Sequence, residues 1–280
     1  MSHIYYSVRT GANKNAKGFQ LSELRELFLR SYEVFKENGY FDEAFGYYCV
    51  DEGDVTGLVQ DIELEILLKI RKKNLWPPTV HIKSYQEDDL LDFIEFLYQH
   101  VSKPIDGTHH SWGDCGMHWE TFNKKEGQLE FAIKINELLS LYHKAFELHP
   151  NGYILEKAEA GFEHIFKADI PTNNKDISSR LESSILSFRR HGATLTDRRN
   201  AVRDLSDVLE YLRPKVKSLF TKKDEKDLFE IANNFGIRHH NDKQKTDYDN
   251  ALWLSWMFYF YLSTIHVLLR KIERDKNKDK

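Results

Sequence analysis

Residues 251–269 read ALWLSWMFYFYLSTIHVLL and form the most apolar segment of the chain. A run of this length matches the thickness of a lipid bilayer, so a membrane-crossing helix is one interpretation. The segment also contains Ser255, Ser263, Thr264 and His266, and no second segment resembles it. A helix buried inside a helical bundle explains this composition better, and we therefore expect no membrane partner.

The less apolar residues of this helix gather on one side. At roughly 100° per residue, Tyr248, Ser255, Tyr259 and His266 all lie within about 20° of one common direction. One face of a bundle helix ordinarily meets water, and this stripe is the least apolar face available. The remaining faces are aromatic or aliphatic, which is more apolar surface than one bundle covers easily. The segment therefore predicts a homodimer formed through the C-terminal helix.

The segments before this helix predict a mainly α-helical protein of two domains. Apolar residues recur at helical spacing in three further C-terminal segments, which favours a four-helix bundle: 176–190, 197–212 and 224–234. The turn residues Pro171-Thr172-Asn173-Asn174 mark a boundary. We predict an N-terminal helical, or α+β, domain at 1–170 and a bundle at 171–275.

The N-terminal domain is predicted to contain five helices, at 20–38, 55–73, 87–101, 128–148 and 155–168. In the second of these, Leu58, Ile62, Ile66 and Ile70 are expected to face inward. Residues 105–127 show no clear period, and a stretch this long is either functional or partly stranded.

Composition limits the function classes. The 280 residues fit two domains of roughly 150 residues each, and 41% hydrophobic residues suffice for buried cores. The net charge of −4 supplies no global basic field for nucleic acid, although a local site remains open. Two widely separated cysteines, Cys49 and Cys115, form no disulfide framework and are typical of a reducing cytoplasm.

The sequence NNFGIRHHNDKQKTDYD, residues 233–249, concentrates proton-exchanging groups in front of the last helix. Arg238 is suited to phosphate, His239 and His240 to acid and base roles, and Asn241 to orienting either. Together they could cleave RNA without a metal ion or any other cofactor, through the ribose 2′-hydroxyl. The alternative is packing, in which the asparagines cap the preceding helix and the histidines cap the next one or contact Tyr248. His266, about 27 Å from Tyr248 along a straight helix, is expected to be a hydrogen-bonded core histidine instead.

Six blocks spanning nearly all of the chain carry a family resemblance: YYSVRTG (5–11), NGYFDEAFGYYCVDEGDV (38–55), EDDLLDFIEFLYQHVSKP (87–104), DRRNAVRDLSDVLEYLRPK (197–215), NNFGIRHHNDKQKTDYD (233–249) and LWLSWMFYFYLSTIHVLLR (252–270). The C-terminal portion resembles HEPN domains (higher eukaryotes and prokaryotes nucleotide-binding), and the whole chain resembles the AbiJ-like abortive-infection proteins. The resemblance implies a bacterial phage-defence effector with a dimeric helical bundle that recognises RNA or cleaves it without metal.

The resemblance places the site in the loop before the last helix. The family signature is an Arg with a His about four to six residues further on. Arg238 matches, but Asp242, Lys243, Gln244 and Lys245 occupy the positions of the later His, and His240 comes too early. Either the histidine pair substitutes, or the module is a non-catalytic sensor or scaffold that binds a nucleotide, RNA or protein. The predicted catalytic residues are Arg238, His239, His240 and Asn241, and the predicted substrate-binding residues are Asn234, Lys243, Lys245 and Tyr248.

A second candidate site lies in the aperiodic stretch. Cys115 is followed at the third position by His118, a spacing typical of metal ligands, and His109 and His110 lie nearby. With Asp106 or Asp114 as a further ligand, these residues could hold zinc and keep an irregular loop ordered. The alternative is a loop packed around Trp112 and Trp119 without metal.

Two charged stretches permit weaker interpretations. Glu87, Asp88, Asp89 and Asp92 could bind a cation, but an acidic first turn also stabilises a helix by itself. Residues 197–200, DRRN, contain a second pair of arginines without a later histidine, which favours a solvated helix start.

Overall fold

The chain is mainly α-helical in the computed structural model, which describes residues 5–13, 18–158, 161–168, 170–219, 221–234, 237 and 249–278. It divides into two compact units, Met1–Leu155 and Glu156–Lys280. The division falls fifteen residues before the predicted position of 170. The reason is that Phe166 and Ile170 pack into the core of the second unit.

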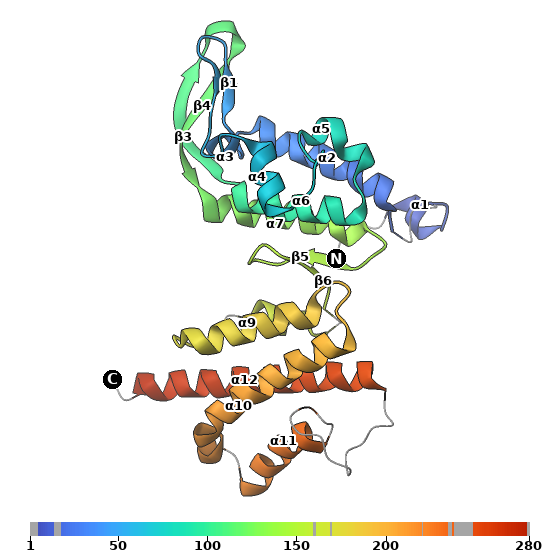
Figure 1. Cartoon of the computed structure of the whole chain (residues 1–280), viewed down its shortest axis with the longest axis vertical. Helices are drawn as coiled ribbons and strands as arrows, with labels where there is room; N and C mark the ends of the chain where they lie inside the picture. Colours follow the sequence, from blue (N-terminus) through green and yellow to red (C-terminus); the bar gives the residue numbers. More distant parts are fainter. Residues whose placement is uncertain are drawn as a thin grey trace. The chain divides into compact units, whose positions relative to one another are not determined.

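The first unit consists of helices and three small antiparallel pairs of strands (Figure 1). Its helices are α1 (Tyr6–Arg9), α2 (Leu21–Glu37), α3 (Asp42–Phe45), α4 (Ile62–Lys69), α5 (Pro78–His81), η2 (Ile82–Ser84), α6 (Glu87–His100), η3 (Trp112–Asp114) and α7 (Lys124–Leu141). Its strands are β1 (Tyr47–Cys49), β2 (Gly53–Val55), β3 (Lys103–His110), β4 (Gly116–Asn123), β5 (Phe146–Leu148) and β6 (Ile154–Glu156), the last of which ends in the second unit.

Two long helices of the first unit, α2 and α6, begin at reciprocal caps. Gln20 and Glu23 form a capping box at the start of α2, and Gln86 and Asp89 form one at the start of α6. The apolar faces of these helices meet in a core where Phe28 and Phe93 contact each other edge to face. The predicted helices 20–38 and 87–101 are therefore confirmed to within a residue or two.

Other predictions in this unit need correction. The predicted helix 55–73 is confined to α4, because Val55 is paired with Tyr47 in the β1–β2 hairpin. Ile66 is buried as expected, whereas Leu58 precedes the helix and is 80% exposed. The predicted helix 128–148 ends at Leu141 in α7, and the chain then turns into β5.

The aperiodic stretch forms a second hairpin. β3 pairs with β4 from Lys103–Asn123 to His110–Gly116, and η3 makes the turn between them. Figure 1 shows this hairpin and β1 extending together beyond the helices of the unit. No residue of β1, β2, β3 or β4 belongs to the apolar core cluster described for this unit. The ends of these hairpins therefore lie outside the apolar core of the unit.

The second unit contains α8 (Glu163–Lys167), α9 (Lys175–Arg189), α10 (Leu195–Leu219), α11 (Lys222–Asn234) and α12 (Asn250–Lys278). α10 packs against both α9 and α12, and the core that they share includes Leu205, Phe258 and Leu262. The predicted helix 197–212 is longer than expected, because α10 continues through Pro214. Directly before this proline, Arg213 joins α10 to α11 through a 2.8 Å bond to Glu225.

The last helix exposes a different line of residues from the one that the sequence predicted. Ser255, Tyr259 and His266, the stripe expected to meet water, are each 7% exposed. The exposed line runs instead through Leu252, Trp256, Ser263 and Val267. The packing of α9 and α10 decides this orientation, because the helix has apolar residues on every face and its pattern selects none of them.

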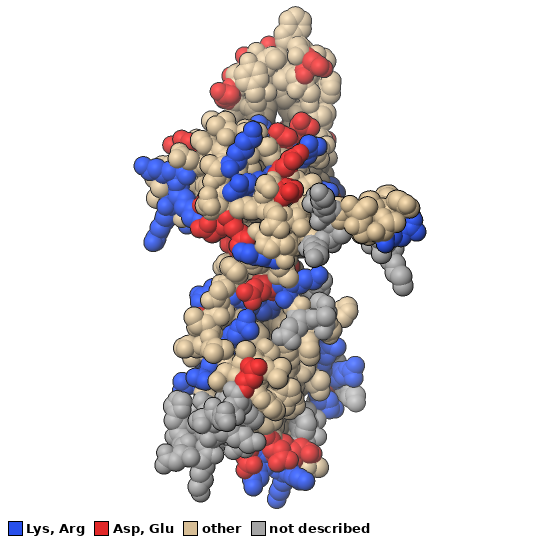
Figure 2. Space-filling view, turned by 90° about the vertical axis from the view of Figure 1, so that its right-hand side faces the viewer, with Lys and Arg blue, Asp and Glu red and all other residues tan. Residues whose placement is uncertain are grey.

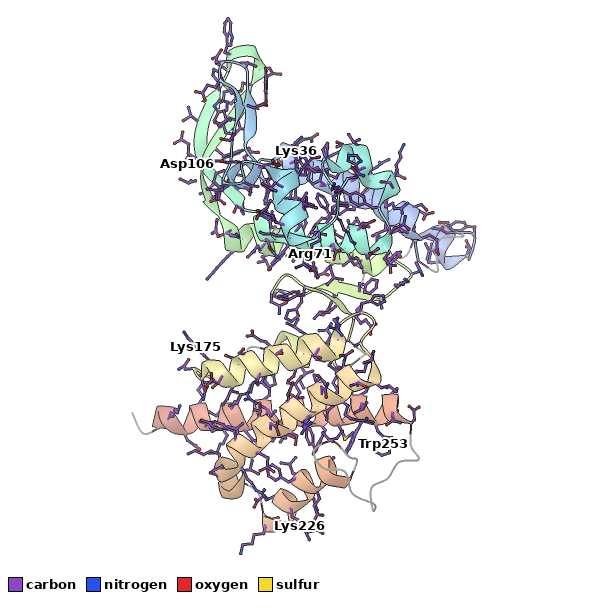
Figure 3. The ribbon with its side chains drawn as sticks, viewed as in Figure 1. Lys36, Arg71, Asp106, Lys175, Lys226 and Trp253 are labelled. Carbon is purple, nitrogen blue, oxygen red and sulfur yellow. The ribbon has the colours of Figure 1, made fainter. Side chains whose placement is uncertain are left out.

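This helix is also long and apolar enough to cross a membrane, by length and composition. Its most apolar window is 61% buried inside the protein. Asp249 begins the helix by accepting bonds from the amides of Ala251 and Leu252, and Figure 3 shows Trp253 near that end.

Candidate functional site

Four potential metal ligands converge where the two hairpins of the first unit meet. Each of four residues contributes one ligand atom, and these atoms all lie within 4.8 Å of one another: Cys49, His110, Cys115 and His118. Cys49 ends β1, His110 ends β3, Cys115 follows η3 and His118 lies in β4. Three separate pieces of backbone thus meet at one point.

The turn around η3 brings the second pair of ligands into place. Gly113 and Gly116 have positive φ values of 59° and 95°, which glycine adopts without steric cost, and they bracket Cys115. A Cβ on Gly113 would lie 3.3 Å from the side chain of Val50, so η3 lies close against the β1–β2 turn. The tip of one hairpin is therefore held against the tip of the other.

Two sulfur–nitrogen distances within the group are close to the edge length of a tetrahedral site. Cys115 Sγ lies 3.2 Å from His118 Nε2, and Cys49 Sγ lies 3.8 Å from His110 Nδ1. Zn–S and Zn–N bonds of about 2.3 and 2.05 Å at tetrahedral angles give a sulfur–nitrogen edge of about 3.6 Å. The two measured edges lie on either side of that value, so an ion fits with small adjustments of the side chains.

A second layer of contacts orients two of the four ligands. His110 Nε2 lies 3.1 Å from Asp51 Oδ2, which leaves Nδ1 to face Cys49. A carboxylate on the outer nitrogen is the arrangement that fixes the tautomer and ring of a metal-bound histidine. The Asp51 amide also donates a hydrogen bond to Cys49 Sγ at 3.4 Å. Asp51 alone thus supports one sulfur and one nitrogen.

The structure changes the predicted ligand set. It brings together His110, Cys115 and His118, as the sequence suggested, but His109 is an exposed neighbour on β3 and is not part of the group. Asp106 lies nearer the base of the hairpin (Figure 3) and, like Asp114, does not join the group. The position expected for an aspartate is taken by Cys49. The two cysteines are 66 positions apart in the sequence. The one signal in the sequence that could have paired them is that the chain contains no other cysteine.

The predicted RNA site belongs to the connection between α11 and α12. Arg238, His239, His240, Asn241, Lys243, Lys245 and Tyr248 lie outside the described residues, as does the side chain of Asn234. In the chain, they fall between the end of α11 and the start of α12.

One described arginine lies beside the start of α12. The Arg199 guanidinium donates to Asn250 Oδ1 at 3.2 Å, and its Nε is buried without a hydrogen-bond partner in the described part of the chain. Arg198 bonds to Glu156 at 3.3 Å and also lies over the ring of Phe188. Residues 197–200 are therefore only partly the solvated helix start that was expected.

The acidic turn of α6 already contains a cation, the side chain of Lys72. Its ammonium lies 2.9 Å from carboxylate oxygens of Asp88, Asp89 and Asp92. Burial lowers the pKa of Lys72, but the bonds to the three aspartates raise it more, so that the pKa is well above its usual value. The cluster is thus an internal ion-pair network, and a metal ion is not needed there.

On the face drawn in Figure 2, basic and acidic side chains intermingle among the described residues. This face therefore has no single basic patch that would indicate a nucleic-acid partner.

Comparisons of the chain with protein families, with curated proteins and with solved structures found no match. Its function is therefore inferred from its own residues and their geometry.

Proposed function

We propose that the second unit is a HEPN-type helical bundle that recognises RNA in the bacterial cytoplasm, as part of an AbiJ-like phage-defence protein. The carrying observation is the location of the arginine–histidine sequence, in the connection that leads into the long buried helix α12. This order of elements is the one that the family resemblance implies.

The contact between α10 and α12 supports the same location. Because Arg199 bonds to Asn250, a guanidinium lies at the residue where the connection enters α12. An arginine there adds positive charge next to the amide end of a helix, which favours a phosphate group nearby. Arg199 would then assist Arg238 in holding the RNA backbone.

The proposed chemistry needs no metal ion. Arg238 would hold the phosphate, one of His239 and His240 would take the proton of the 2′-hydroxyl, and the other would protonate the leaving oxygen. Asn241 would orient the histidines. Asn234, Lys243, Lys245 and Tyr248 would contact the flanking nucleotides through charge and stacking.

The second candidate function is binding without cleavage, as a sensor or scaffold. It is favoured by one observation, namely that residues 242–245 provide no histidine at the positions where the family signature has one. The first and second functions share the loop and differ only in whether the histidine pair transfers protons.

We further propose that the protein is a homodimer through α12. Trp256 stacks on Phe260, yet 41% of its surface is exposed, and Leu252 and Val267 extend the same line. The segment 250–269 carries no Lys, Arg, Asp or Glu, so this face is suited to an apolar partner rather than to RNA. A second copy presents the same uncharged line about a two-fold axis.

RNA cleavage is tested with end-labelled RNA and purified full-length protein in EDTA. Wild type should cut, and Arg238→Ala should lose at least about 10²-fold in rate, the usual contribution of such groups. Arg274→Ala, an exposed arginine near the end of α12, is the matched control and should retain full activity. Cleavage that persists in Arg238→Ala would refute the assignment. Salt-sensitive binding without any cleavage would establish the second candidate function instead.

The dimer is tested by light scattering at micromolar concentration. Trp256→Glu should convert a dimer into a folded monomer, whereas Leu129→Glu, on an exposed position of the first unit, should leave it dimeric. A wild-type monomer would refute this part of the proposal.

A further inference from the structure

We propose that Cys49, His110, Cys115 and His118 bind one Zn²⁺ ion in a closed tetrahedral site that fastens the β3–β4 hairpin to the β1–β2 hairpin. The inference is independent of the RNA-directed function, because all four ligands belong to the first unit. It replaces His109 and the aspartates of the sequence-based ligand set with a single residue, Cys49.

The donor atoms select the metal. Two thiolates and two imidazoles in a tetrahedral arrangement are a ligand set typical of zinc, whereas magnesium, calcium and manganese prefer oxygen ligands. Four protein ligands complete the coordination and leave no position for water or substrate. The site is therefore structural rather than catalytic.

The tips of the two hairpins lie outside the apolar core of the unit, so a metal ion would stabilise the contact between them. Tyr48, Val50, Trp112 and Met117 are exposed, and Tyr47 and Trp119 are half-buried. Small elements without a core of their own are commonly ordered by a metal ion, whose binding energy becomes folding energy. Cys49, only 2% exposed, is the buried side of the site.

A disulfide between the two cysteines is the competing explanation, since both sulfur atoms belong to the same group. A disulfide would use neither imidazole, yet each imidazole faces a sulfur atom. It would also give no role to Asp51, which supports Cys49 and His110 together. The whole arrangement, rather than the pair of sulfurs, is explained by a metal ion.

The test uses full-length protein purified without a metal-affinity tag or chelator. Elemental analysis should find about one zinc per chain, and two thiols should become reactive only when zinc is released. Zinc X-ray absorption should report two sulfur and two nitrogen ligands. His110→Gln should lose most of the zinc, and His109→Gln, its exposed neighbour, should retain all of it.

If the variants fold poorly, replacement of zinc by cobalt in the wild-type protein tests the same proposal. Wild-type protein stripped by a chelator and reloaded with Co²⁺ should show the visible absorption of a tetrahedral site and the charge-transfer bands of thiolate ligands. Substoichiometric zinc with both thiols reduced would overturn the proposal. So would a Cys49–Cys115 disulfide in the isolated protein, an octahedral cobalt spectrum, or equal loss of zinc in His109→Gln and His110→Gln.

Discussion

The bundle of α9, α10 and α12 and the paired hairpins of the first unit are ordered by different kinds of contact. In the bundle, Phe258 has no exposed surface and stacks on Phe188, with the ring centroids 3.9 Å apart. At the hairpin tips, two cysteine sulfur atoms lie 3.2 and 3.8 Å from imidazole nitrogens. Apolar burial needs many residues with the right period, whereas coordination needs only four residues in the right places.

This difference explains why the helices of the bundle could be predicted from the sequence, whereas the docking of the two hairpins could not. It also implies that the two regions fail under different treatments. Loss of a buried ring should disrupt the bundle and leave the hairpins intact, while loss of a ligand contact should do the reverse.

The largest effect is expected from Phe258→Ala. Removing a fully buried ring leaves a cavity, and such changes lower the free energy of unfolding by about 3–5 kcal/mol. Tyr211→Ala, which removes a ring that is 67% exposed on α10, should cost less than about 0.5 kcal/mol. Urea denaturation followed by circular dichroism measures both, and similar losses in the two variants would contradict the described core.

The next effect tests the hairpins. Asp51→Asn removes the carboxylate from His110 Nε2, and loss of such an outer contact typically weakens metal binding by about 10–100-fold. Competition with a chromophoric zinc chelator measures the change. Asp54→Asn, an exposed aspartate on β2, should bind zinc as wild type does. Equal affinities for wild type and Asp51→Asn would show that the carboxylate does not support the site.

A smaller gain is expected from His266→Leu. His266 was expected to be a satisfied core histidine, and it is buried, but neither ring nitrogen has a hydrogen-bond partner in the described part of the chain. Replacing an unsatisfied polar group by an apolar one should stabilise the second unit by about 1–2 kcal/mol at pH 7.5. His266→Asn keeps a buried polar group and should bring no such gain. A strongly destabilised leucine variant would reveal a partner for the imidazole.

The same residue predicts a pH dependence. Burial, assisted by Arg270, lowers the pKa of His266, so the unfolded chain takes up its proton at a higher pH than the folded one. Stability is therefore lost as the pH falls from about 6.5 towards the lowered value. Thermal melts from pH 8 to pH 5 should show a smaller decline for His266→Leu than for wild type, and parallel declines would exclude His266 as the source.

The smallest effect lies where the second hairpin meets the helices. Gly39 lies against Trp119 of β4 and near the Asp42 carboxylate, whose pKa is raised to about 6 by burial, partly opposed by Lys36. Asp42 favours the folded state less as the pH rises from about 4 through 6, because the folded state resists its ionisation. Asp42→Asn should therefore stabilise the protein by about 1 kcal/mol above pH 7 and should bring no gain at pH 4. The gain above pH 7 is smaller than the full pKa shift implies, because the carboxylate is partly exposed to solvent. A benefit that is equal at both pH values would contradict this cause.

The helices α2, α6 and α9 could be predicted from the sequence, because a period of 3.6 residues is a local property, and α12 could be predicted from the length of its apolar run. The RNA-directed function rests on an equally local sequence, residues 233–249, and stays a proposal. The direction that α12 faces could not be predicted, since its pattern is apolar all round and its neighbours decide which side is buried.

The metal site divides in the same way. Cys115 and His118 are three residues apart, and their spacing alone identified them as candidate ligands. Cys49 and the choice of His110 over His109 depended on tertiary structure, because only the docking of one hairpin tip on the other brings residues 49 and 110 together. Local periodicity and spacing are set by neighbouring residues along the chain, whereas convergence of distant residues depends on how the whole backbone packs.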